Sequence, residues 1–311
     1  MKWSLSAAKT FRKCQREWYF RHCLASPTAN DPARRDAFNL GKLQTVAGWR
    51  GSVVDDIISR TVVGTLKARK MPETGGVLSE ARRIFDMQLD TARKHPLREP
   101  DMPVSSWGRS YAALASVEYG DGPTMDEIDR AWTEISEALR NLLRRRNFLE
   151  RLSAAKILMP QRTLQYADYG VTVVVVPDLV AFYEDEPPAI VDWKTHAVGT
   201  SDAWLQLAIY SSALRRCKPH KDFPEAPSAR APDEIRLVEV QLLLDRMRRH
   251  ELDDEDRASA DDYIAESATA MLAALDGRKG HELAVEDFPA SPFETVCENC
   301  VFKRICWERQ A

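Results

Sequence analysis

The sequence predicts an α/β protein with a central mixed sheet flanked by helices. Two segments read as neighbouring strands: the β-branched run 171–176, whose only polar member is Thr172, and the apolar run that begins at Ala189. A polar turn, 184–188, separates them. Other stretches carry apolar residues at helical spacing, most clearly 125–155. Strands that alternate with helices indicate an α/β fold.

Composition limits the class of protein. The chain has 311 residues, of which 44% are hydrophobic, enough for one large core or two smaller ones. The net charge of −3 means that nucleic acid would have to bind a local basic surface. No run of 18 or more apolar residues occurs, which predicts no membrane span. Lys9, Arg12 and Lys13 interrupt the N-terminal apolar pattern, which is therefore not a signal peptide, and we expect a cytoplasmic protein.

The N-terminal half is predicted to be mostly helical. Ser4 or Ser6 can cap the first helix. Asp55 and Asp56 lie in an aliphatic helical stretch. An exposed helix face would account for one of these two acids, but less easily for both. Three consecutive arginines, 144–146, follow the apolar helical stripe. They are interpreted as a solvated helix end that complements the helix dipole, in preference to one wall of a DNA channel. The predicted segments are a helix over 3–24, a loop over 26–39, a helix over 41–70 broken near 48–51, mixed structure over 71–103 and a helix over 125–155.

The C-terminal half adds a further helix after the two strands. Helical spacing over 200–214 places Gln206 and Tyr210 one turn apart on one face. The other predicted elements are strands over 234–244 and 247–252, a helix over 254–275 and a loop over 277–292. The predicted parts of the chain are N-terminal helices over 1–63, a helical insert over 64–156 that forms a lobe over the active site, a core over 157–290 and a cysteine segment over 291–311.

Charged side chains gather where the two central strands end. Because side chains alternate along a strand, Asp192 and Lys194 share one face and Trp193 points to the other. Asp178, at the end of the preceding strand, is expected beside them. Two carboxylates near a lysine suit a Mg²⁺ or Mn²⁺ site that hydrolyses a phosphodiester, with the lysine serving the attacking water. Taken alone, the sequence Asp192-Trp193-Lys194 would be interpreted as an ordinary surface ion pair between the acid and the lysine.

The wider pattern resembles the signature of the PD-(D/E)xK nuclease superfamily. Pro177 and Asp178 are followed by thirteen residues and then by Asp192, Trp193 and Lys194. The resemblance implies a restriction-endonuclease-like fold and divalent-metal-dependent hydrolysis of DNA. It favours an exonuclease over an endonuclease.

Two further positions extend the resemblance to RecB-like nucleases. Gln206 and Tyr210 resemble the QxxxY motif, which in that family lies on the helix after the D-x-K strand. The family usually has a histidine four residues after a glycine on its second helix; here Asp55 follows Gly51 at that spacing, which implies altered metal preference. The resemblance assigns catalysis to Asp178, Asp192, Lys194, Gln206 and Tyr210, and metal binding to Asp55, Asp178, Asp192 and the Trp193 carbonyl.

The cysteines form a second pattern. The chain has six cysteines. Because a cytoplasmic protein lies in a reducing compartment, we do not expect them to form a disulfide framework. Alone, Cys14 would be a small core residue. Together with Cys297, Cys300 and Cys306, it resembles the iron-sulfur subset of RecB-like nucleases, which includes AddB-type domains and CRISPR-associated exonucleases. The resemblance implies a 4Fe-4S cluster that joins the two ends of the chain. A zinc ion held by four cysteines is the alternative that spacing cannot exclude.

We therefore expect a metal-dependent DNA exonuclease that acts on single-stranded DNA or DNA ends in recombination, repair or CRISPR-type processing. Because no helicase motif is present, unwinding would come from a helicase or a CRISPR adaptation partner. Two alternatives stay open: a non-catalytic DNA-binding or adaptor subunit that keeps the fold, and a zinc-stabilised structural protein without a nucleic-acid role. The intact Asp178, Asp192 and Lys194 count against the adaptor.

Overall fold

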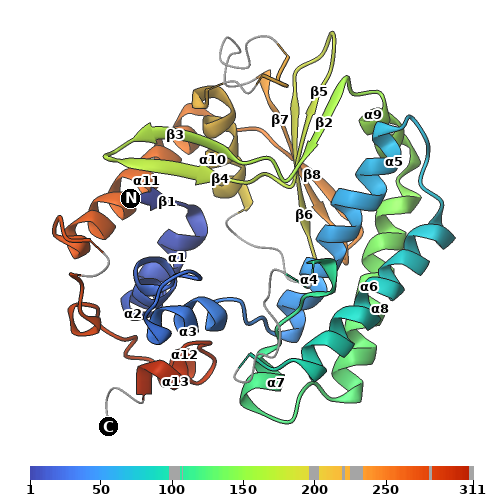
Figure 1. The fold of residues 1–311 in the computed structure, drawn as a ribbon. Helices are drawn as coiled ribbons and strands as arrows, with labels where there is room; N and C mark the ends of the chain where they lie inside the picture. Colours follow the sequence, from blue (N-terminus) through green and yellow to red (C-terminus); the bar gives the residue numbers. More distant parts are fainter. Residues whose placement is uncertain are drawn as a thin grey trace.

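The computed structural model describes residues 1–97, 106, 108–195, 203–218, 221–224, 234–279 and 282–307. Its described strands form two sheets, one of five strands in the order β2-β5-β6-β7-β8 and one of three in the order β1-β4-β3 (Figure 1). The larger comprises β2 (Ile157–Pro160), β5 (Leu179–Phe182), β6 (Ala189–Lys194), β7 (Arg236–Gln241) and β8 (Arg246–His250). The smaller comprises β1 (Lys2–Trp3), β3 (Leu164–Asp168) and β4 (Val171–Val175). The α/β class is confirmed, although a single central sheet was expected.

The five-stranded sheet is mixed, since β6 runs parallel to β7 and antiparallel to β5. The expectation that the run 171–176 is the strand beside Asp192 is wrong. That run forms β4, which pairs with β3 and β1. The neighbour of β6 is β5, a separate strand that starts directly after Asp178. Pro177 has no amide hydrogen for a ladder bond, and it divides the apolar stretch into two strands of different sheets.

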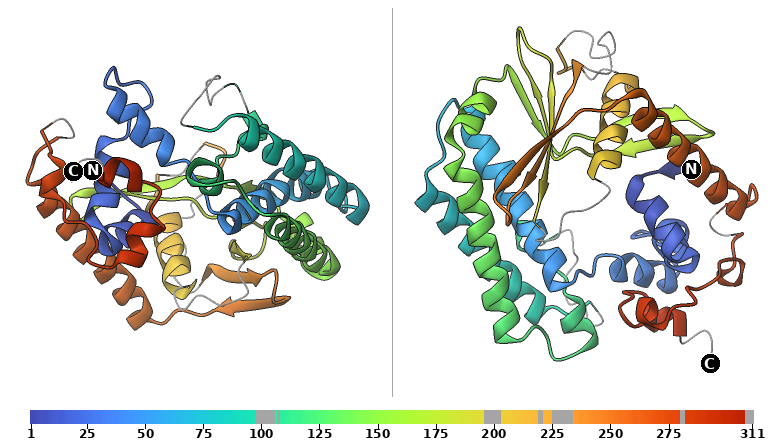
Figure 2. Two further views of the ribbon diagram at one scale, coloured as in Figure 1. Left: turned by 90° about the horizontal axis from the view of Figure 1, so that it is seen from below. Right: turned by 180° about the vertical axis from the view of Figure 1, so that it is seen from behind.

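Helices cover both faces of the larger sheet (Figure 2). On one face, Val191 and Trp193 of β6 belong to a core shared with a helical layer. On the other, Ile190 belongs to a second core, and by alternation Asp192 and Lys194 emerge on this face. The first layer contains α4 (Val46–Asp56), η2 (Ile57–Val62), α5 (Val63–Lys67), α6 (Thr74–Lys94), α8 (Met125–Arg144) and α9 (Arg146–Ser153), and the second includes α10 (Ala203–Arg216) and α11 (Asp254–Leu275).

The first predicted helix is interrupted. Residues 3–24 contain the end of β1, α1 (Leu5–Lys13), α2 (Gln15–Tyr19) and a π-helical turn, η1 (Phe20–Leu24). The break is at Cys14, whose backbone is extended (φ −162°, ψ 112°). Ser4 caps α1 as predicted, since its Oγ accepts a hydrogen bond from Ala7 N at 3.2 Å.

Two other local predictions are wrong. The predicted loop 26–39 contains α3 (Pro32–Leu40), which starts after Asp31, whose side chain accepts from Ala33 N at 2.9 Å. The expected break near 48–51 is absent, because α4 continues through both glycines. A Cβ on Gly51 would lie 3.2 Å from Thr195 Oγ1, so this glycine permits close packing within a helix.

The remaining predictions agree more closely with the structure. The helix 254–275 is confirmed as α11, and the pairing of 234–244 with 247–252 is confirmed as β7–β8. The helix 125–155 is divided at Arg145 into α8 and α9. Residues 200–202 lie outside the described residues, and α10 is described from Ala203. None of the described helices combines the length and apolarity that crossing a bilayer requires. The short elements are η4 (Gly108–Ser110), α7 (Ala115–Tyr119), η7 (Val285–Asp287), α12 (Glu294–Glu298) and α13 (Lys303–Trp307).

The two ends of the chain pack together. The N-terminal helices and the C-terminal helices α12 and α13 lie side by side in every view (Figures 1 and 2). The rings of Phe20 and Phe302 are 5.6 Å apart, and those of Tyr19 and Phe288 stack at 4.7 Å. These aromatic contacts bring Cys14 to the C-terminal cysteines.

Candidate active site

The predicted catalytic residues meet at the end of β6. Lys194 Nζ lies 2.6 Å from Asp192 Oδ2, and Asp192 is only 1% exposed. Gln206 Oε1 accepts a hydrogen bond from Lys194 Nζ at 2.8 Å. The Gln206 amide donates to Asp192 Oδ1 at 3.1 Å and to the Tyr210 hydroxyl at 2.6 Å. Residues one helical turn apart on α10 therefore hold the lysine and the carboxylate of β6 in one network.

Asp178 completes this group from the neighbouring strand. The β5–β6 register pairs Leu179 with Val191, which leaves Asp178 beside Asp192 where the two strands meet their loops. Asp178 Oδ2 accepts from the Trp193 amide at 2.8 Å. The Trp193 side chain belongs to the core on the opposite face of the sheet, as alternation predicts.

Gln161 is a site residue that the sequence reasoning missed. Its amide donates to Asp55 Oδ1 at 2.8 Å and to Asp178 Oδ1 at 3.3 Å, so it bridges the two carboxylates. Gln161 follows β2 with a positive φ of 51°, and its backbone N donates to the Asp178 carbonyl at 3.0 Å. No sequence motif marks this position, because its place depends on how β2 lies against β5.

Helix α4 brings Asp55 to the other carboxylates. Arg50 Nη2 donates to the Thr195 carbonyl at 2.9 Å, directly after β6. Gly51 allows α4 to approach the same residue closely. Asp55 is one turn further along α4 and meets Gln161. Gly51 therefore lets α4 pack against the end of β6, and Asp55, four residues later, reaches the other carboxylates as a result.

The carboxylates disfavour one another's ionisation. Burial, followed by the charges of Asp192 and Asp55, raises the pKa of Asp178 to about 7, against the lowering effect of the Trp193 amide hydrogen bond. Burial also raises the pKa of Asp55, although its hydrogen bonds act in the opposite direction. Burial and then the charge of Asp192 raise the pKa of Tyr210, so its hydroxyl stays protonated. Crowded, buried carboxylates are a setting that a cation would stabilise.

The donor chemistry suits a hard divalent cation. The available ligands are the oxygens of Asp55, Asp178 and Asp192 and the Trp193 carbonyl, the class that Mg²⁺ and Mn²⁺ prefer. In the part of the chain that the structure describes, no three histidine, cysteine, aspartate or glutamate side chains are grouped closely enough to hold a metal ion. Hydrogen-bond donors contact the carboxylates instead. The Gln161 amide donates to Asp55 and Asp178, and the Lys194 ammonium pairs with Asp192.

The four predicted cluster cysteines line one cavity. Cys14, Cys297, Cys300 and Cys306 all face it, and all six cysteines of the chain lie within the described residues and are free thiols. Burial and the neighbouring Cys14 and Cys306 raise the pKa of Cys297, so these sulfurs are close enough for their charges to interact. Burial raises the pKa of Cys300 to about 11. Thiolate sulfurs are the donors that an iron-sulfur cluster or zinc requires, although the described residues include no three cysteines grouped closely enough to hold a metal ion.

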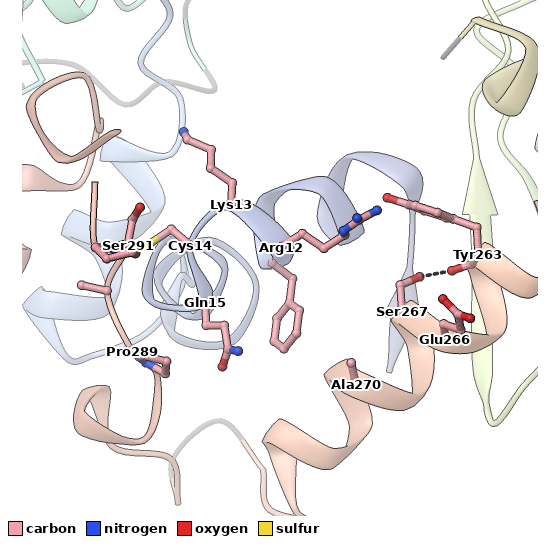
Figure 3. Close-up of a pocket in the computed structure, with 13 residues that line it drawn as sticks. Arg12, Lys13, Cys14, Gln15, Tyr263, Glu266, Ser267, Ala270, Pro289 and Ser291 are labelled. Carbon is pink, nitrogen blue, oxygen red and sulfur yellow. Dashed lines mark hydrogen bonds between the residues drawn. The ribbon is translucent and has the colours of Figure 1, made fainter. Parts of the chain in front are cut away.

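A larger cavity of about 600 Å³ adjoins Cys14 (Figure 3). It lies between α1, α11 and residues 289–292, and its lining includes no residue of the carboxylate site. The Arg12 guanidinium lies 5.5 Å from the centre of the Tyr263 ring at one side of the cavity. The cavity therefore belongs to the surroundings of the cysteines.

Comparisons with known proteins include a family model that covers almost the whole chain. The family model described as the PD-(D/E)XK nuclease superfamily matches residues 2–307. None of the curated proteins matches the chain. A solved structure of an inferred exonuclease from Eubacterium rectale is 13% identical with a TM-score of 0.46, over 95% of this chain and 87% of that chain. The structure of a protein called SSO0001 is 14% identical with a TM-score of 0.28, over 58% of this chain and 73% of that chain.

Proposed function

Since the chain belongs to the PD-(D/E)XK nuclease superfamily, we propose that it is a divalent-metal-dependent deoxyribonuclease that digests single-stranded DNA or DNA ends as an exonuclease. The observation that carries the proposal is the buried network in which Lys194 Nζ is held 2.6 Å from Asp192 and 2.8 Å from Gln206, with Asp178 beside it. A surface ion pair would not need four polar groups held in one buried place.

Each residue has a role in this proposal. Asp55, Asp178 and Asp192 would hold the cation, together with the Trp193 carbonyl. When bound, the cation supplies positive charge that offsets the charge developing on the phosphodiester. Lys194 would orient the attacking water, because an ammonium carries three N–H donors and the contacts of its Nζ with described residues use two of them.

The test is digestion of end-labelled DNA with Mg²⁺ or Mn²⁺, comparing single with double strands and free with blocked ends. Lys194→Ala should lower the rate by at least about a hundredfold. Lys156→Ala is the matched control, since that lysine is 55% exposed in a surface ion pair, and it should cleave like the wild type. Equal cleavage of blocked and free ends would indicate an endonuclease. DNA binding without cleavage by the wild type would favour a non-catalytic subunit.

We propose further that Cys14, Cys297, Cys300 and Cys306 hold a 4Fe-4S cluster that joins the ends of the chain. The shared cavity of the four sulfurs supports this proposal. Protein purified without oxygen should be brown and contain about four irons per chain. Cys14→Ser should lose the colour, whereas Cys217→Ser, a buried cysteine outside the cavity, should keep it. Colourless protein with one zinc per chain would establish the zinc alternative.

The biological setting follows from the same proposal. A nuclease with no helicase motif would act on ends or strands that a helicase or a CRISPR adaptation partner exposes, in recombination, repair or CRISPR-type processing. Co-purification with such a partner from the native host, followed by reconstitution of digestion on duplex DNA, tests this assignment.

A further inference from the structure

The edge strand β8 carries three exposed arginines, Arg246, Arg248 and Arg249. Its register pairs Arg246 with Gln241 and Arg248 with Glu239 of β7. Directly paired residues point to the same face of a sheet. Arg246 and Arg248 therefore share one face, and Arg249 points to the other.

The face of Arg246 and Arg248 is the face of the active site. The β6–β7 register pairs Asp192 with Glu239 and Lys194 with Gln241. Two rows of side chains thus cross the sheet from the active site to its edge: the Asp192–Glu239–Arg248 row and the Lys194–Gln241–Arg246 row. Because neighbouring strands are about 4.8 Å apart, the arginine Cα atoms are about 10 Å from those of Asp192 and Lys194.

The residues in the middle of these rows are polar but buried. Glu239 and Gln241 are each 1% exposed. Gln241 donates to Glu239 Oε1 at 2.8 Å, and His250 Nε2 lies 2.9 Å from Glu239 Oε2. Burial acts to raise the pKa of Glu239, but its hydrogen bonds and the nearby charge of Arg248 hold it below its usual value. This effect of Arg248 agrees with its place on the same face.

The positive charge at the edge is not cancelled by the turn acid. Asp245, between β7 and β8, pairs with Arg145 at 2.6 Å on the α8–α9 side. Within the described residues, no carboxylate forms an ion pair with Arg246 or Arg248. In a chain with a net charge of −3, Arg246 and Arg248 thus place two exposed positive charges at the edge of the active-site face.

We propose that Arg246 and Arg248 bind backbone phosphates of the DNA strand that flank the scissile phosphate, on the side of the active site where β8 forms the exposed edge of the sheet. The inference rests on the proposed nuclease function. Guanidinium groups match phosphate oxygens in charge and geometry, and phosphate contacts set the register of a strand. An exposed arginine on an edge strand can also serve to prevent pairing between sheets. Arg249 would serve that purpose equally well, whereas only Arg246 and Arg248 face the active site.

The experiment compares the Arg246→Ala/Arg248→Ala double variant with Arg249→Ala. Binding of a fluorescently labelled single-stranded oligonucleotide is measured by anisotropy with Ca²⁺, across a series of salt concentrations. The double variant should bind about tenfold more weakly, with a salt slope smaller by about 1.4, as expected for two lost single-strand phosphate contacts. Arg249→Ala should stay within about twofold of the wild type. With Mn²⁺, the double variant should raise KM and leave kcat unchanged.

Equal effects of the double variant and Arg249→Ala, or an unchanged salt slope, would overturn the inference. Thermal melts of all variants exclude unfolding, and the Arg246→Gln/Arg248→Gln pair repeats the test with retained side-chain bulk. If the wild type cleaves DNA but the variants do not differ, only the role of the two arginines is wrong. If the wild type binds as described but cleaves nothing, that role stands and the nuclease proposal fails. A wild type that binds no oligonucleotide overturns both.

Discussion

Replacing Asp178 by asparagine is expected to stabilise the metal-free protein at alkaline pH while abolishing its nuclease activity. Burial, followed by the charge of Asp192, raises the pKa of Asp178 from 3.8 to about 7. Between these values the folded protein keeps a proton that the unfolded chain has lost, so stability falls as the pH rises through this range. Above about pH 7, the folded state carries the full cost of the buried charge.

The magnitude follows from the size of this displacement. About three pH units at about 1.4 kcal/mol each correspond to about 4 kcal/mol. Asparagine removes the charge but retains an acceptor for the Trp193 amide, while its own amide competes with the Gln161 amide. We therefore expect Asp178→Asn to raise the free energy of unfolding by about 2–4 kcal/mol at alkaline pH. Near pH 5 the difference should be smaller, about 1–2 kcal/mol, because the unfolded chain has already lost the proton there, and it should approach zero only below about pH 3.8, where the carboxyl is neutral in both states.

Urea denaturation in EDTA at about pH 5 and about pH 8.5 measures both values. Asp185→Asn is the matched control, because this acid is exposed in the turn between β5 and β6, and it should change stability by less than about 0.5 kcal/mol at either pH. A variant that is no more stable than the wild type at alkaline pH would show that the Asp178 carboxylate is not under electrostatic strain, and the case for a cation between the carboxylates would weaken.

Two further predictions concern the same site. Because Asp178 must lose its proton to bind a cation, Mn²⁺ affinity should fall about tenfold per pH unit below about 7, with release of a proton on binding, as measured by calorimetry in buffers of different ionisation enthalpy. A pH-independent affinity would remove Asp178 from the ligand set. Gly51→Ala should lower activity and stabilise the protein less than the same change at an open helical position, since the added Cβ would meet Thr195 Oγ1 at 3.2 Å and that hydroxyl must shift by a few tenths of an ångström. Gly64→Ala, where no atom lies within 4 Å of the added Cβ, should stabilise the protein by about 0.5–1 kcal/mol, and equal effects of the two changes would contradict the proposed close packing.

The sequence by itself determined the features that depend on local periodicity. Alternation along β6 places Asp192 and Lys194 on one face, and the helical repeat places Gln206 and Tyr210 one turn apart. The helix 254–275 was also predictable, since its apolar positions and its Asp253 cap are encoded within the segment. These features could be predicted because each needs only neighbouring residues and the geometry of one element.

Only the tertiary structure decided which elements lie beside one another. Pairing of β5 rather than β4 with β6, the bridge from Gln161 to two carboxylates, and the rows that lead to Arg246 and Arg248 all depend on strand order and register. The physical reason is that an apolar run can lower its free energy in several sheets, and the choice among them is made by the packing of the whole chain. A side chain such as Gln161, with no motif of its own, gains its place in the site only after that choice.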